Sequence, residues 1–178
     1  MLRLILRYGV IAGLIVGVPM FSLTVFGRNA GLEKYGYLIG YTTMLIALST
    51  IFIAIKNRRD TVLGGVIRFW PALGIGLGIS FVAGIFYVLS WELAVDLTHL
   101  DFASSYAQAM IDAAKAKGLT GDALAKAVAD AEQFKVNYAN PFYRLPMTFI
   151  EIFPVGVLVS LVSAALLRNS RFLAVRRV

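Results

Sequence analysis

Glu151 is the residue in this sequence whose type and position most directly suggest chemistry. It lies inside the apolar segment 147–168, MTFIEIFPVGVLVSLVSAALLR, which is long enough to cross a bilayer. A carboxylate inside hydrocarbon is costly, so it should face protein or water, carry a counter-charge or hold a proton. Arg144 precedes it by seven positions, which is about two helical turns and nearly the same helix face. The spacing predicts an Arg144–Glu151 ion pair.

Three further polar residues are expected at a similar depth and complete an intramembrane polar cluster with Glu151 and Arg144. They are Tyr143, Tyr87 and Glu92. Two roles fit such a cluster: a polar clamp that holds the helices together, or a protonatable site that handles protons or cations. The residue types leave both roles open.

A second acidic group follows the third apolar run. Glu92, Asp96 and His99 recur at i, i+4 and i+7, which places three weak candidate metal ligands on one helix face. A hydrated acidic helix end explains the same residues without a second histidine or a cysteine, so we predict no metal site and no cofactor. The chain also contains no G-x-S-x-G, H-E-x-x-H, Walker or dinucleotide motif. We therefore expect a protein that is not an enzyme.

The composition indicates the class of protein that positions these residues. Of the 178 residues, 59% are hydrophobic, and the mean hydropathy is +0.77, whereas soluble domains are about 45–50% apolar. Four apolar runs, at 4–26, 35–55, 69–91 and 145–167, can supply the roughly 20 helical residues that span hydrocarbon. Because backbone groups in lipid must be paired internally, the sequence predicts a single all-α membrane domain, a four-helix bundle covering residues 1–178.

The basic residues indicate how the bundle is oriented. The net charge is +7, and one side of the predicted spans has a single acid, Asp60, among many basic residues. These basic residues are Arg3, Arg7, Lys56, Arg58, Arg59, Arg68, Arg168, Arg171, Arg176 and Arg177. The positive-inside rule then predicts that both termini and the 56–68 loop are cytoplasmic. Topology accounts for the basic character, so no nucleic-acid partner is expected.

The segment 92–144 is the one long stretch between spans, and it is predicted to lie outside the cytoplasm. Apolar residues recur with helical spacing from Phe102 onward, Gly118 ends this helix, and Thr120 caps a second helix that stops at Asn140. We expect an extracytoplasmic αα-hairpin with a thin, alanine-rich contact. It should need the membrane face, another copy or a partner to stay ordered.

Small residues recur at four-residue spacing in every predicted span, which allows helices to approach closely in lipid. The predicted packing positions are Gly9, Gly13, Gly17, Gly36, Gly40, Gly76, Ser80, Gly84, Gly156 and Ser160. Packing within one chain and contact between chains both fit these stripes. Pro19 and Pro154 each leave a carbonyl unpaired four residues earlier, so both are expected to kink their helices.

Four phrases of the sequence resemble the bacterial domain of unknown function 4199 family. They are YGVIAGLIVG, IGYTTMLIALSTIFIAIKNRRD, GGVIRFWPALGIGLGIS and NPFYRLPMTFIEIFPVGVLVSLVSAALLRN. The resemblance covers nearly the whole chain and includes the Gly64–Gly65 turn and the Glu-x-x-Pro formed by Glu151 and Pro154. It implies a four-span bacterial inner-membrane protein with no assigned activity, and it supplies no catalytic residues.

Together these features predict a non-enzymatic, multi-pass protein of the bacterial inner membrane, surrounded by the lipid bilayer. The leading interpretation is that it acts by association, as a homo-oligomer or as an accessory subunit beside another membrane protein in an envelope complex. The alternative is a small dimeric proton- or cation-coupled transporter that uses Glu151.

Overall fold

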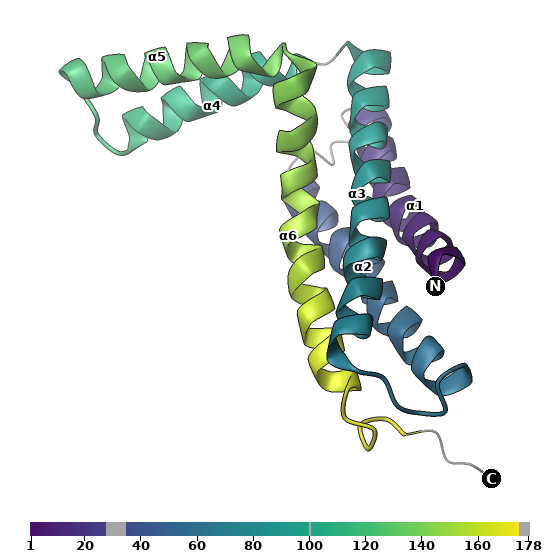
Figure 1. The fold of residues 1–178 in the computed structure, drawn as a ribbon. Coiled ribbons are helices and arrows are strands. Elements are labelled where there is room, and N and C mark those ends of the chain that lie inside the picture. The colour runs from purple at the N-terminus through teal and green to yellow at the C-terminus, as the bar shows by residue number, and fades with distance from the viewer. Residues whose placement is uncertain (28–34, 100, 175–178) are drawn as a thin grey trace.

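A computed structural model describes residues 1–27, 35–99 and 101–174, and it contains six helices within those ranges (Figure 1). In chain order they are α1 (Leu2–Phe26), α2 (Gly36–Thr61), α3 (Phe69–Thr98), α4 (Phe102–Ala116), α5 (Gly121–Tyr138) and α6 (Pro141–Leu167). Four of them, α1, α2, α3 and α6, are long and apolar enough to cross a membrane. These are the four predicted spans, and the all-helical prediction is confirmed for the described residues.

Three of the spanning helices are longer than predicted at a polar end. α2 continues to Thr61, α3 continues to Thr98, and α6 begins at Pro141. With 30 residues, α3 is about 45 Å long at 1.5 Å per residue, which exceeds the roughly 30 Å of hydrocarbon. Because the last turns of α3 carry Glu92 and Asp96, we expect this end of the helix to extend beyond the apolar layer.

Small residues bring α1, α3 and α6 close together within one chain. Gly13 lies so near α3 that a Cβ added to it would sit 2.5 Å from the Phe86 Cβ. Between α3 and α6, Gly76 faces Ser160 and Gly156 faces Ser80. The stripes on these three helices therefore serve packing within the chain, whereas a Cβ at Gly40 on α2 would meet no described atom within 4 Å.

The two ends of the bundle are built differently, and we name them by what they contain. The terminal end holds the turn between α2 and α3 and the end of α6, and the arm end holds the start of α6 and the end of α3 (Figure 1). Met1, just before α1, lies near the residues of that turn. At the terminal end, Arg59 is fully buried and donates hydrogen bonds to the carbonyls of Phe172 and Leu173. It also pairs with Asp60, so it holds the segment after α6 against α2.

Helices α4 and α5 lie side by side and extend sideways from the arm end, and we call residues 102–138 the arm (Figure 1). Asp101 caps α4 by accepting a hydrogen bond from the Ser104 N–H. Gly118 follows this helix with a positive φ of 76°, as its predicted role at the helix end requires. Thr120 is the N-cap residue of α5 but makes no side-chain capping hydrogen bond.

Candidate ligand-binding cavity

A cavity of about 540 Å³ lies between the spanning helices and the base of the arm. Side chains from all six helices line it, and they are mostly apolar or aromatic. Thr24, Thr43 and Thr148 lie on its wall, but each hydroxyl donates to a carbonyl of its own helix. Glu151 is the one acidic residue among the described lining residues, which include no lysine or arginine.

Glu151 accepts a single side-chain hydrogen bond within the described part of the chain. The Tyr87 hydroxyl on α3 donates to its Oε2 at 2.9 Å. No basic group of residues 1–27, 35–99 or 101–174 lies within ion-pair distance of Glu151. The carboxylate is therefore exposed to the cavity without a counter-charge from the described residues.

The predicted Arg144–Glu151 pair is wrong, because Arg144 pairs with Glu92. The Arg144 Nε donates to Glu92 Oε1 at 2.7 Å, and its Nη2 donates to the other carboxylate oxygen. Nη1 also donates to the Tyr138 carbonyl at 3.4 Å. Helical side chains lean toward the start of their helix, so Arg144 points away from Glu151 and toward the extended end of α3.

The structure thus divides the predicted polar cluster in two. Glu92 and Arg144 meet at the arm end, whereas Glu151 and Tyr87 meet deeper in the cavity. Tyr143 is exposed and makes no side-chain hydrogen bond to either pair. Arg144 is therefore balanced by Glu92, and no lysine or arginine in the described part of the chain pairs with Glu151.

Aromatic side chains close the cavity at the arm end. The Trp91 indole N–H donates to the Tyr138 hydroxyl at 2.8 Å, which connects α3 to α5. Phe102 on α4 packs edge-on against Trp91 and stacks with Tyr106, with ring centroids 5.1 and 5.6 Å apart. Burial raises the pKa of Tyr138, so its hydroxyl stays protonated at neutral pH. The arm is therefore attached to the bundle through the wall of the cavity.

Sequence reasoning missed this aromatic wall, although the sequence contained a signal for it. Phe102 and Tyr106, like Phe134 and Tyr138, are four residues apart and so share a helix face. Helical spacing placed Phe102 and Tyr106 on one face, but nothing local indicated that this face meets Trp91.

The other predicted site residues have separate positions. Glu92 is taken by Arg144, Asp96 is exposed, and His99 follows α3 in a left-handed conformation with φ of 48°. In the described ranges no three His, Cys, Asp or Glu side chains are grouped so that they could hold a metal ion. Pro19 lies in α1 on the cavity wall, and Pro154 lies in α6 one turn below Glu151.

Comparison with known proteins gives a family match and nothing further. A family model described as a protein of unknown function (DUF4199) matches residues 7–169. No curated protein matches the chain, and no solved structure matches it.

Proposed function

Since the chain belongs to the DUF4199 family of proteins of unknown function, we propose its function from the cavity: it binds a cationic, amphipathic small molecule there. In this proposal it is a non-enzymatic transporter whose binding is coupled to the protonation of Glu151. The observation that carries the proposal is an acidic side chain without a basic partner on the wall of a cavity of about 540 Å³.

Charge balance supports a cationic ligand. An ionised carboxylate away from bulk water needs a counter-charge, and otherwise it takes up a proton. Tyr87 supplies one hydrogen bond and no charge, and the charge of Arg144 is already balanced by Glu92. A bound cation and a proton would therefore compete for Glu151, and this competition is the basis of proton coupling.

The shape and lining of the cavity support an amphipathic, aromatic-binding ligand. Small-molecule sites typically have volumes of about 300–1,000 Å³ and mostly apolar walls, a range that includes this cavity. Aromatic residues line the cavity, and the faces of such rings attract cations. They are Tyr41, Tyr87, Trp91 and Tyr106. Tyr41 lines the cavity and is 61% exposed, which supports entry of a ligand from outside the bundle.

Two probes of the same shape and opposite charge test the proposal. Tetraphenylphosphonium should bind the purified protein in lipid nanodiscs, and tetraphenylborate should bind much more weakly. Glu151→Gln should weaken tetraphenylphosphonium binding about tenfold or more, which is about 1.4 kcal/mol. Lowering the pH from about 7 to about 4, through the range in which an ordinary glutamate takes up its proton, should weaken wild-type binding, and the variant should lose this dependence.

Glu132→Gln is the matched control, because Glu132 is an exposed glutamate on α5 that pairs with Lys135. It should bind tetraphenylphosphonium as the wild type does. Equal binding of both probes, or an unchanged affinity in Glu151→Gln at both pH values, would exclude Glu151 as the binding group.

Association with another copy or with an envelope complex is the second candidate function. The observation that favours it is the arm, whose two helices pack mainly against each other and extend beyond the bundle (Figure 1). Val136, at 68% exposure, and Val128 leave apolar surface on α5. Native mass spectrometry in mild detergent tests this candidate: Val136→Lys should release a copy or partner that binds through the arm.

A further inference from the structure

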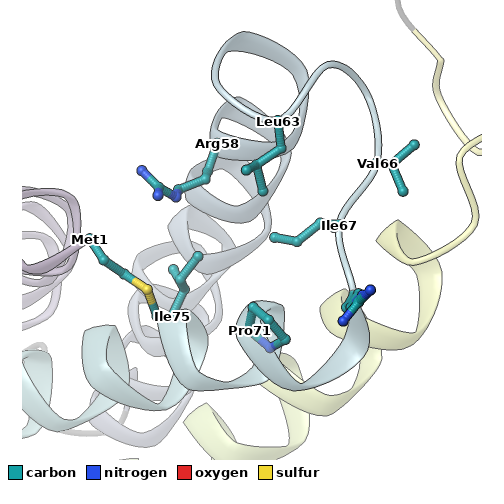
Figure 2. A pocket seen from close by; sticks show the side chains of 8 residues that line it. Met1, Arg58, Leu63, Val66, Ile67, Pro71 and Ile75 are labelled. Carbon is teal, nitrogen blue, oxygen red and sulfur yellow. The ribbon is translucent and has the colours of Figure 1, made fainter.

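A second pocket lies at the opposite end of the bundle from Glu151, and Figure 2 shows it from close by. Its volume is about 350 Å³, and its walls come from the start of α1, the end of α2, the α2–α3 turn and the first turns of α3. Met1, Ile67, Pro71 and Ile75 make it apolar. Figure 2 shows Met1 reaching toward Ile75 on α3 while Ile67 points in from the turn.

Two arginines, Arg58 and Arg68, line the same pocket. Neither guanidinium has an acidic partner among the described residues. The one acid nearby in the sequence, Asp60, is taken by Lys56 and Arg59. The pocket therefore combines an apolar interior with two positive charges that no described residue balances.

We propose that this pocket binds an anionic phospholipid, with Arg58 and Arg68 holding its phosphate and the apolar wall receiving the start of an acyl chain. Guanidinium groups suit phosphate because their N–H donors match the geometry of its oxygens. Trp70, which precedes the lining residue Pro71 in the chain and is 76% exposed, is of a type enriched where helices leave the hydrocarbon. The site is thus at the depth of lipid headgroups.

The apolar wall distinguishes a lipid from free phosphate. Inorganic phosphate would contact only the two arginines and would leave the surface of Ile67, Pro71 and Ile75 without a ligand. A phospholipid fills both parts, because its phosphate and its acyl chain are joined. The positive-inside rule alone explains why arginines lie at this end, but it does not explain why two of them flank a pocket.

The test measures lipid binding by native mass spectrometry with short-chain phosphatidylglycerol and with phosphatidylcholine of the same chain length. Wild-type protein should prefer phosphatidylglycerol. Arg58→Gln combined with Arg68→Gln should reduce this preference about fivefold for each arginine, the effect expected of one basic residue near anionic lipid. The matched control is Arg168→Gln with Arg171→Gln, which removes the same charge from exposed positions at the same end and should keep the preference.

Two further experiments identify the source of the phosphate, and they keep the test decisive if the double variant fails to fold. Glycerol 3-phosphate, which has no acyl chains, should not displace phosphatidylglycerol from wild-type protein. A photoreactive phosphatidylglycerol should label the wild-type segment 58–75. An equal loss in the control variant, displacement by glycerol 3-phosphate, or labelling only outside that segment would each overturn the proposal.

Discussion

At the scale of residues, the two glutamates on facing helices, Glu92 and Glu151, have different partners. Glu92 balances Arg144, and their side chains are 25% and 20% exposed. Glu151 accepts one hydrogen bond from the neutral Tyr87 hydroxyl. Because the pair at the arm end is already neutral, Arg144 cannot also balance Glu151 without giving up Glu92. In the proposed function, the first carboxylate is therefore structural, and the second is available to a ligand.

A double-mutant cycle tests this division of roles. Glu92→Gln and Arg144→Gln should each lower the free energy of unfolding in detergent by about 1–3 kcal/mol, between the values for exposed and buried pairs. The double variant should recover part of the loss. Glu151→Gln and Arg144→Gln should instead have additive effects, because these residues are not partners. Stronger coupling of Arg144 to Glu151 than to Glu92 in thermal melts would contradict the structure.

At the scale of elements, the small-residue stripe on α1 determines how closely α1 approaches α3. Gly9, Gly13 and Gly17 lie against Val82, Phe86 and Ser90 of α3. In lipid the hydrophobic effect contributes little between helices, so close packing of this kind holds them together. The stripe on α2 differs, because Gly36 and Gly40 line the cavity. Small residues therefore have two roles here, close contact on α1 and open space on α2.

Alanine substitutions at Gly13 and Gly40 separate these two roles. Gly13→Ala should destabilise the protein by about 1–3 kcal/mol, the usual cost of overpacking, because its Cβ would meet Phe86 at 2.5 Å. Gly40→Ala is the matched control and should be neutral or slightly stabilising, since alanine favours the helix by up to about 1 kcal/mol. Equal melting temperatures in detergent would show that α1 and α3 are not packed as described.

The sequence was sufficient for the helices but not for contacts between them. Hydropathy located α1, α2, α3 and α6 because the length of an apolar run is a local property, and Gly118 marked the end of α4 for the same reason. The partner of Arg144 depends on how far α3 extends and on how α3 is shifted along its axis relative to α6. Gly84 of α3 packs against Phe149 of α6 and shows this relative position. Such register is set by tertiary packing. The cavity likewise arises from the spacing of several helices.

At the scale of the whole molecule, the two candidate sites lie at opposite ends of the bundle. The acidic site at Glu151 lies toward the arm end, and the basic pocket at Arg58 and Arg68 lies at the terminal end. The positive-inside rule predicts that the terminal end is cytoplasmic. In that orientation the cavity faces the outer leaflet and the basic pocket faces the inner leaflet. The membrane orientation thus decides from which side each ligand arrives.

Single cysteines test this orientation directly, because the natural chain contains none. Ala116 ends α4 in the arm, Asn57 lies on the exposed side of α2 near the terminal end, and Ala174 follows α6. In intact spheroplasts, a cysteine at Ala116 should react with a membrane-impermeant maleimide, and those at Asn57 and Ala174 should react only after permeabilisation.

The reverse pattern would place the cavity toward the cytoplasm and the basic pocket in the outer leaflet. Labelling of both Ala116 and Ala174 from the same side would instead contradict the membrane-spanning role of α6. This helix is the one described span between the two positions, so it should place them on opposite sides of the membrane.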